Sequence, residues 1–237
     1  MLLLIILALA NVCFAQNSVA IHMINRRNIS QNLNALLIAC SQIAELAVGS
    51  SEREDFFASQ GNIFDVPDEV KFYAAAARLP GVYRIGEIGF NAGHSTVTFL
   101  FQRHNIHVTS FDLGQMKWTT NSVKFVQRMF PNRLDYLKGY STDTVPKYDG
   151  PLFDLFAIDG SHNGDVPYAD LLNGKRVTKP GGYVLIDDFT QTNIDVKNAW
   201  ARAKREGLIE EILCKDPGVV VYGAQKAYCL GSYTANL

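Results

Sequence analysis

The sequence predicts an α/β protein built on a doubly wound, mostly parallel sheet. From Val82 onward, apolar strand-like runs alternate with stretches compatible with helices. The runs are rich in Val, Ile, Leu and Phe and lack a clean polar alternation, which is typical of parallel strands buried on both faces. Helices between such strands cover the two faces of the sheet, so this order favours a doubly wound fold.

Length and charge limit the classes of protein to consider. The chain has 237 residues, of which 48% are hydrophobic and 19% charged, and its net charge is −1. This length suits one α/β domain with a full core and is too short for two domains of ordinary size. Because the charge is near neutral and no long basic run occurs, we expect no nucleic-acid partner.

The first residues, MLLLIILALANVCFA, form a short apolar run. A helix that spans a bilayer needs roughly 20 apolar residues, which this run does not supply. Small residues at Cys13 and Ala15 place a cleavage before Gln16, so residues 1–15 are predicted to be a secretory signal peptide, although Lys and Arg are absent from its start. The alternatives are an uncleaved anchor and a buried N-terminal helix. With cleavage, we expect a secreted or secretory-pathway protein without a membrane span.

After cleavage the remaining cysteines are Cys40, Cys214 and Cys229. An odd count allows at most one internal disulfide and leaves one free thiol. Cys214 and Cys229 could face each other across a C-terminal hairpin, but the register of a hairpin does not follow from the sequence. Cys40 lies on an apolar stripe and is expected in the core. The sequon Asn28-Ile29-Ser30 has meaning only in the secretory pathway.

Residues 16–80 are predicted to form a helical segment that packs on a domain at 81–237. Apolar residues recur at helical spacing over Ser30–Val48, whereas Gly49–Asp65 is polar and predicts a loop. The acids of Pro67-Asp68-Glu69 suit the first turn of a helix, which Pro80-Gly81 ends after Leu79.

Within the domain, the strands are expected at Val82–Ile88, Ile106–Phe111, Leu134–Leu137, Leu152–Ile158 and Tyr183–Ile186. The helices between them are expected at Ser95–Arg103, Thr120–Phe130 and Tyr168–Val177, with a less clearly helical connection before the fourth strand. A helix at Ile194–Glu206 and a strand at Ile209–Cys214 follow, and the last strand is either Val219–Tyr222 or Ala227–Tyr233.

The stretch Tyr83–Ser95, YRIGEIGFNAGHS, predicts a ligand-binding turn. A strand carrying the acid Glu87 leads into Gly89, Asn91 and Gly93, and a helix can begin directly afterwards. Small residues let a ligand approach the backbone, and the free N–H groups of the helix start favour anionic groups. Glycine-rich turns also occur without ligands, so this stretch gains weight only from matching parts elsewhere.

Polar residues follow the ends of the other strands, where ligands bind in open parallel sheets. Asp112 follows the second strand and suits a ribose, although it could also be a turn residue. Ser141 follows the third strand and could touch an adenine. Asp159 ends the fourth strand, and Asp187 and Asp188 end the fifth. Adjacent strand residues point to opposite faces, so Asp187 and Asp188 reach one ligand only if the chain turns outward at once; this makes Asp188 the weaker of the two candidates.

Four separated motifs occur in order: EIGFNAGHST at 87–96, FDLG at 111–114, FDLFAIDGSH at 153–162 and KPGGYVLIDD at 179–188. With them the chain resembles the class I S-adenosylmethionine-dependent methyltransferases. It is similar to the family of macrolide-sugar O-methyltransferases and, more distantly, to catechol O-methyltransferase. The turn differs from the G-x-G-x-x-G that a nicotinamide enzyme prefers. The resemblance implies a seven-stranded, mostly parallel sheet with a C-terminal antiparallel strand.

The resemblance also implies roles for individual residues. Those for the cofactor are Glu87, Gly89, Asn91, Gly93 and Ser95 at the methionine end, Asp112 at the ribose and Ser141 at the adenine. Those for a divalent metal are Asp159, Asp187 and Asp188. His162 stands at the position of the general base, although it could instead be an exposed loop histidine.

The chemistry of these groups agrees with that set. Carboxylates favour a hard divalent ion such as Mg²⁺, which lowers the pKa of a bound hydroxyl, and an imidazole near neutral pH can take the proton. We therefore expect methyl transfer to a hydroxyl of a small molecule or sugar. The alternatives are a secreted protein that keeps the fold and binds a small ligand without catalysis, and a methyltransferase that needs no metal.

Overall fold

The structure is a computed structural model that describes residues 63, 66–221 and 224–235 of the chain. The predicted signal peptide at 1–15, the helix at Ser30–Val48, the sequon and Cys40 lie outside these residues. None of the helices within the described ranges has the length and apolar character that a membrane crossing requires.

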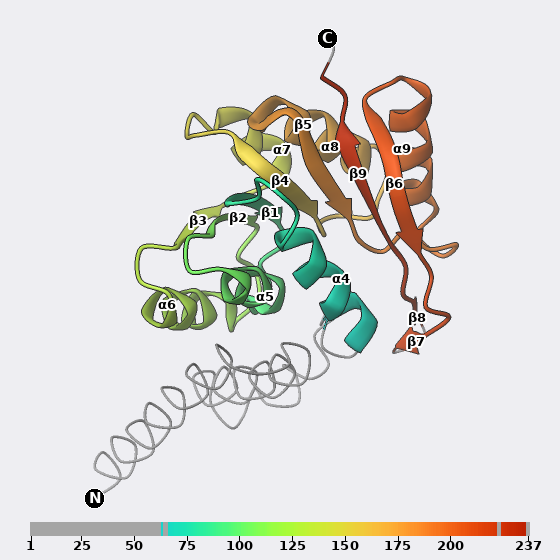
Figure 1. Ribbon diagram of the computed structural model, residues 1–237. Coiled ribbons are helices and arrows are strands. Elements are labelled where there is room, and N and C mark those ends of the chain that lie inside the picture. Colours follow the sequence, from blue (N-terminus) through green and yellow to red (C-terminus); the bar gives the residue numbers. More distant parts are fainter. Residues whose placement is uncertain (1–62, 64–65, 222–223, 236–237) are drawn as a thin grey trace, which may run out of the picture. The chain divides into compact units, whose positions relative to one another are not determined.

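The core of the described part is a seven-stranded sheet with the order β3-β2-β1-β4-β5-β9-β6 (Figure 1). Its strands are β1 (Arg84–Ile88), β2 (His107–Asp112), β3 (Leu134–Lys138), β4 (Phe153–Ile158), β5 (Thr178–Ile186), β6 (Ile209–Lys215) and β9 (Tyr228–Tyr233). The pairings from β3 to β5 are parallel, and β9 is antiparallel to both β5 and β6. The predicted fold class, including the C-terminal antiparallel strand, is confirmed.

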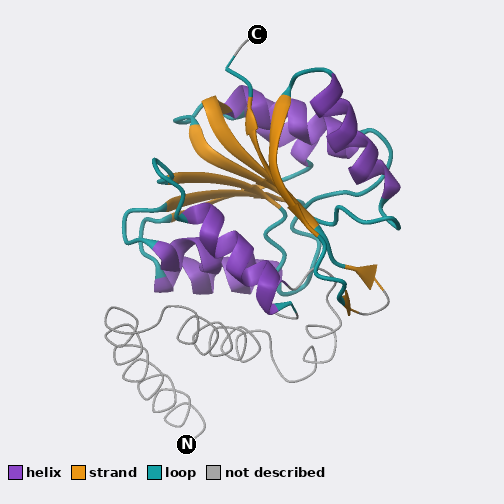
Figure 2. Cartoon of the chain, turned by 45° about the vertical axis from the view of Figure 1, so that its right-hand side comes forward, coloured by secondary structure: helices purple, strands orange, loops and turns teal. Residues whose placement is uncertain are grey.

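Helices cover both faces of this sheet (Figure 2). On one face lie α4 (Pro67–Ala77), α5 (His94–Gln102) and α6 (Thr119–Met129). On the other lie α7 (Ser141–Thr144), the 3-10 turn η2 (Val145–Lys147), α8 (Val166–Val177) and α9 (Ile194–Arg205). The less clearly helical connection before the fourth strand is thus the short α7 followed by η2.

The central strands are buried because both of their faces carry helices. Every residue of β4 is buried, and in β1 only Arg84 at its start is partly exposed. This explains why these strands lack an alternating polar pattern. In contrast, β3 lies at the sheet edge, and only its first residue, Leu134, is buried.

The C-terminal strands form a hairpin closed by a disulfide. The sequence left two candidates for the last strand; the structure places Tyr228–Tyr233 in the main sheet, while β7 (Val220–Val221) pairs with β8 (Ala224–Gln225) in a separate small sheet. In the β6–β9 register Cys214 lies opposite Cys229, and the two form a disulfide with a Cα–Cα distance of 4.1 Å.

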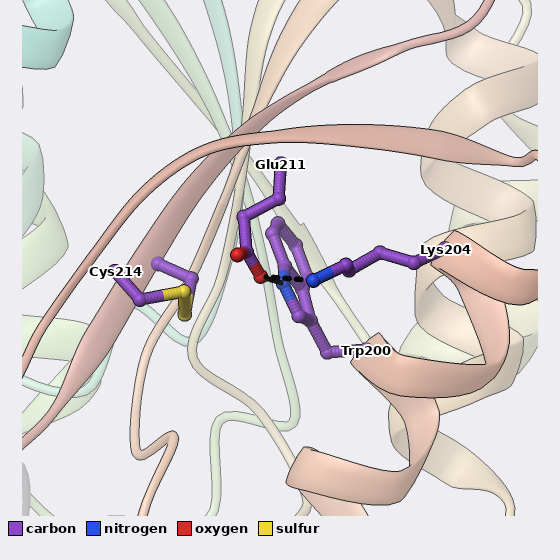
Figure 3. Close-up of a disulfide and its surroundings, with 5 residues drawn as sticks. Trp200, Lys204, Glu211 and Cys214 are labelled. Carbon is purple, nitrogen blue, oxygen red and sulfur yellow. Dashed lines mark hydrogen bonds and ion pairs between the residues drawn. A yellow bond between two sulfur atoms is a disulfide. The ribbon is translucent and has the colours of Figure 1, made fainter.

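Helix α9 packs beside this hairpin (Figure 3). Two α9 side chains donate to one oxygen of Glu211 on β6: Trp200 Nε1 lies 2.8 Å from Glu211 Oε2, and Lys204 Nζ lies 2.9 Å from it. The Trp200 ring is 1% exposed, so the bond satisfies the N–H of an otherwise apolar, buried side chain.

Candidate functional site

The ends of four parallel strands lie in one register. Ile88 of β1 is paired with Phe111 of β2 on one side and with Ile158 of β4 on the other, and Ile158 is paired with Ile186 of β5. The residues that follow these positions therefore lie side by side at the carboxyl edge of the sheet. This edge is the usual ligand position in open parallel sheets.

The glycine-rich turn lies at this edge between β1 and α5. Gly89 has φ +95°, and a Cβ atom there would lie 1.9 Å from the backbone oxygen of Asp159. Gly93, with φ +90°, precedes the first residue of α5, and Asn91 has φ 50°. The turn thus needs glycine for both conformation and space, and it packs directly on the chain at Asp159.

Glu87 lies beneath the turn, almost fully buried at 1% exposure. Its carboxylate accepts hydrogen bonds from the hydroxyls of Ser95, Thr96 and Ser110, the last at 2.9 Å. Burial raises the pKa of Glu87 to about 7, although these hydroxyls oppose the rise. Both Glu87 and Ser95 were predicted to line the cofactor, and in the structure they form one hydrogen-bonded unit.

Asp112 connects the end of β2 to the turn. Its Oδ2 accepts from the backbone N–H of Asn91 at 2.9 Å, and its Oδ1 accepts from the backbone N–H of Gly114 at 2.6 Å. The Asn91 side chain in turn accepts from Trp118 Nε1 at 2.8 Å. The candidate ribose acid is therefore held at the edge of the predicted cofactor turn, and the buried Trp118 lies beside that turn.

Ser141 begins α7, directly after β3. It lies beside Asp170 of α8, whose carboxyl is fully buried and was not singled out in the sequence. Burial raises the pKa of Asp170 to about 6, and the Ser141 hydroxyl opposes that rise. Ser141 thus stands at the predicted edge of the sheet, but its hydroxyl faces another side chain of the chain.

Asp159, His162 and Asp188 come together after β4 and β5. One potential ligand atom from each lies within 4.8 Å of the others. Within this group, His162 Nε2 is 3.0 Å from Asp188 Oδ2. Asp188 is buried, whereas Asp159 and His162 are partly exposed. His162 therefore contacts Asp188 and its side chain is 35% exposed, so it is not a fully exposed loop histidine.

The adjacent acids Asp187 and Asp188 have different surroundings. Asp188 has φ 52°, so the chain turns outward there and directs its side chain to the group with Asp159 and His162. Asp187 instead accepts from the Tyr73 hydroxyl at 3.1 Å and from the backbone N–H of Asp188 at 2.7 Å. The sequence placed Asp187 above Asp188 as a metal candidate; in the structure Asp188 groups with Asp159 and His162, and the charge of Asp187 also acts on Asp159.

Two further charged residues face these acids and were not predicted. Glu69 of α4 is fully buried, faces Asp187, and receives no N–H or O–H donor among the described residues. Lys226, just before β9, has Nζ 3.6 Å from Asp188 Oδ1, and its side chain is 7% exposed. The sequence showed Glu69 only as a helix-start acid and Lys226 only as a lysine beside a strand, so neither could be assigned without the contacts.

We call Glu69, Asp159, Asp187 and Asp188 the acid cluster. Burial raises the pKa of Glu69, Asp159 and Asp187, and the negative charge of neighbouring acids raises each further. Burial alone would also raise the pKa of Asp188, but His162 and Lys226 lower it, and the bond to Asp188 raises the pKa of His162.

This donor set fits a divalent cation. The cluster brings four carboxyl groups together beside Lys226 and His162, and the buried carboxyl of Glu69 faces the carboxyl of Asp187. Carboxylate oxygens are the ligands that Mg²⁺ prefers. A cation would offset the repulsion that raises these pKa values.

His94, at the first position of α5, is buried, and burial lowers its pKa to about 4. Its imidazole is therefore neutral near physiological pH.

Known proteins match the central part of the chain and share its fold. A family model described as a methyltransferase domain matches residues 87–189. No curated protein sequence matches the chain. Among solved structures, cofactor-bound Rv0187 from MTB has a TM-score of 0.65 and 17% identity, over 89% of this chain and 92% of that chain.

Two other similar structures are named for methyl transfer to different atoms, oxygen in one and nitrogen in the other. The O-methyltransferase from Bacillus cereus in complex with SAH has a TM-score of 0.64 and 13% identity, over 92% of this chain and 97% of that chain. The N-methyltransferase NodS from Bradyrhizobium japonicum, with S-adenosyl-L-homocysteine, has a TM-score of 0.60 and 11% identity, over 82% and 98%. These identities show a common fold and leave the acceptor atom open. Residues 87–189 thus match a methyltransferase-domain model, and the chain shares the fold of these methyltransferase structures.

Proposed function

We propose that this protein is an S-adenosylmethionine-dependent methyltransferase that methylates a hydroxyl of a small molecule or sugar. A divalent cation assists the reaction, and Mg²⁺ is the cation we propose. The observation that carries the proposal is the group of Asp159, His162 and Asp188 beside the glycine-rich turn. An acid pair and a base next to a cofactor turn suit the activation of a hydroxyl. The cofactors named for similar structures support the choice of S-adenosylmethionine.

In this proposal the turn at Gly89, Asn91 and Gly93 holds the methionine end of the cofactor over the Glu87–Ser95 unit. Asp112 faces the ribose, with Ser141 at the adenine side. The internal hydrogen bonds of Glu87 and Asp112 keep both carboxylates in place before the cofactor arrives. Such preorganisation lowers the cost of binding.

Asp159 and Asp188 would hold the metal, with Asp187 and Glu69 as neighbouring acids. When bound, a divalent cation would polarise the acceptor hydroxyl and lower its pKa. The residues of this chain would position the acceptor, and the fold keeps Glu69, Asp187 and Asp188 out of bulk solvent.

His162 acts as the general base in this proposal. Its Nε2 faces Asp188, so Nδ1 is left to accept a proton, and the carboxylate holds the ring and stabilises its charged form. The acceptor oxygen loses its proton to His162 while it forms a bond to the methyl carbon. The carbon–sulfur bond breaks, its electron pair stays on sulfur, and S-adenosylhomocysteine leaves.

We also propose that the protein enters the secretory pathway. The apolar run at residues 1–15 supports this, and the Cys214–Cys229 disulfide is a bond that an oxidising compartment maintains. Mass spectrometry of the protein secreted from eukaryotic cells tests it, and a retained N-terminal Met1 in a cytosolic product would contradict it.

Calorimetry with S-adenosylmethionine and S-adenosylhomocysteine tests cofactor binding. We expect binding to the wild type and its loss in Asp112→Ala, whose carboxylate contacts the turn. The matched control is Asp135→Ala on β3, an acid that is 65% exposed and away from the turn. Absence of binding by the wild type would reject the methyltransferase and leave the ligand-binding alternative.

Turnover is then measured with methyl-labelled cofactor and a panel of phenols and sugars. Asp159→Ala and chelator should each abolish transfer, and undiminished activity in chelator would indicate the metal-free alternative.

His162→Gln should lower the rate by about 10²–10⁴-fold, the usual contribution of a general base. The control His107→Gln removes another histidine beside an aspartate, since His107 Nε2 lies 3.5 Å from Asp135, and should leave the rate unchanged.

A further inference from the structure

Lys226 is held next to the acid cluster by its backbone. Its N–H donates to the Val219 carbonyl at 3.0 Å, and the carbonyl of the next residue, Ala227, accepts from the N–H of Phe189 at 2.7 Å. Phe189 directly follows Asp188, so the chain before β9 is bonded to the loop that carries this acid. The position of Lys226 is therefore coupled to that of Asp188.

The side chain of Lys226 completes the surroundings of the Asp188 carboxylate. Lys226 Nζ lies 3.6 Å from Oδ1, and His162 Nε2 lies 3.0 Å from Oδ2. The side chains of Lys226 and Asp188 are only 7% and 10% exposed, so solvent screens this pair weakly. Each Asp188 oxygen thus faces a nitrogen supplied by the chain itself.

A divalent cation at Asp159 and Asp188 would share Asp188 with this ammonium. Two positive centres on one buried carboxylate repel each other, and in a site shielded from solvent that repulsion is large. Metal binding must therefore overcome Lys226 or move its ammonium away. Conversely, the ammonium offsets part of the repulsion within the acid cluster when no metal is present.

We propose that Lys226 is a built-in cation of the acid cluster, a positioning residue that holds Asp188 toward His162 and competes with a divalent cation for the Asp188 carboxylate. The inference rests on the proposed function in one respect, the binding of a divalent cation at Asp159 and Asp188. If Lys226 competes in this way, the site keeps its shape without metal. It then binds metal only at a higher cation concentration than a site without this lysine would need.

Titration of the full chain with Mn²⁺ at pH 8, followed by calorimetry and by the electron paramagnetic resonance of free Mn²⁺, tests the competition. Lys226→Met should bind Mn²⁺ about tenfold or more tightly than the wild type, because the competing charge is gone. Lys226→Arg keeps the charge and should bind as the wild type does. The control Lys204→Met removes a lysine from another ion pair, with Glu211, and should change nothing.

Thermal unfolding with and without Mn²⁺ gives a second readout. Without metal, Lys226→Met should unfold at a lower temperature than the wild type, and Mn²⁺ should raise its melting temperature more than that of the wild type. Should Lys226→Met fail to fold, Lys226→Gln provides the same neutral comparison.

Equal or weaker Mn²⁺ binding by the neutral variants, or no Mn²⁺ binding by any variant, would overturn the competition. Failure of the proposed function is separate, because it shows as absent cofactor binding or absent methyl transfer. The Mn²⁺ titration needs neither cofactor nor acceptor.

Discussion

At the residue scale, the contact between Gly89 and Asp159 joins the two halves of the site. The strands β1 and β4 are neighbours in register, so the glycine-rich turn after β1 lies on the acid that follows β4. Only a residue without Cβ permits this, because that atom would be 1.9 Å from the Asp159 oxygen. The glycine therefore sets the separation between the predicted methyl donor and the predicted metal site.

Gly89→Ala should abolish cofactor binding and lower stability by more than about 2 kcal/mol, since it combines backbone strain with a clash against buried backbone. Gly81→Ala is the matched control: Gly81 has φ +80°, but a Cβ there meets nothing within 4 Å. It should cost about 1 kcal/mol and leave binding intact. Chemical denaturation and calorimetry measure both effects, and equal losses in the two variants would contradict the role of the contact.

Glu87 is the second informative residue, because burial raises its pKa from an ordinary value of 4.5 to about 7. A raised pKa means that the folded protein holds the proton more tightly than the unfolded chain does. The protonated Glu87 makes its full contribution to the free energy of unfolding below about pH 4.5, and that contribution is lost as the pH rises to about 7. Above that range the buried carboxylate remains a stability cost of at most about 3 kcal/mol.

Glu87→Gln should therefore raise the melting temperature at pH 8 relative to the wild type, and the difference should shrink as the pH falls toward 5. The same variant should bind S-adenosylmethionine more weakly, because it loses the negative charge beneath the turn. Thermal unfolding across this pH range and calorimetry at pH 8 check the two expectations. A difference in melting temperature that does not change with pH would show that Glu87 is not the titrating group.

At the element scale, the β6–β9 hairpin links stability to the site. Its disulfide joins residues 15 positions apart, and the chain between them carries Lys226 next to Asp188. Since β9 pairs with β5 on its other side, the hairpin also supports the strand that carries Asp187 and Asp188. A covalent bond there restricts the unfolded chain and keeps the acid cluster assembled.

Removal of this bond by Cys214→Ala with Cys229→Ala should lower the free energy of unfolding by about 3 kcal/mol, the usual effect of closing a loop of this length. Wild-type protein in reductant should approach the same value. Urea denaturation with and without dithiothreitol measures both. If reductant also destabilises the double variant, its effect does not arise from this disulfide.

At the scale of the whole molecule, the candidate site is shared by many elements. The described cofactor and metal candidates come from the ends of β1, β2, β3, β4 and β5, and Glu69 of α4 and Lys226 before β9 add to them. A ligand that contacts so many elements binds only the folded state. Binding must then stabilise the entire domain.

S-adenosylmethionine at about 100 times its dissociation constant should raise the free energy of unfolding by about 2.7 kcal/mol. In Asp112→Ala the same concentration should give no stabilisation, whereas exposed Asp135→Ala should respond as the wild type does. Differential scanning fluorimetry over a cofactor titration measures this. A rise in the Asp112→Ala variant equal to that of the wild type would remove Asp112 from the cofactor site.

The sequence by itself determined the fold class and the positions of the main candidates. Apolar runs alternating with helices are local patterns of the sequence. The glycine and acid motifs directly follow strands, and each of these strands can be recognised by itself. Asp112 and Asp159 could be assigned because in a parallel sheet all carboxyl ends lie at one edge, whatever the exact register. The seven-stranded sheet with a C-terminal antiparallel strand followed from the resemblance of the motifs, whereas the strand order came from the structure.

Only the tertiary structure decided contacts between segments distant in the chain. The register of β9 placed Cys229 against Cys214 and Lys226 against Asp188, and the backbone turn at Asp188, φ 52°, brought its carboxylate to Asp159 and His162. Glu69 entered the acid cluster through the packing of α4. No local pattern encodes these outcomes, because each depends on register and packing between elements, and those are set by the free energy of the whole fold.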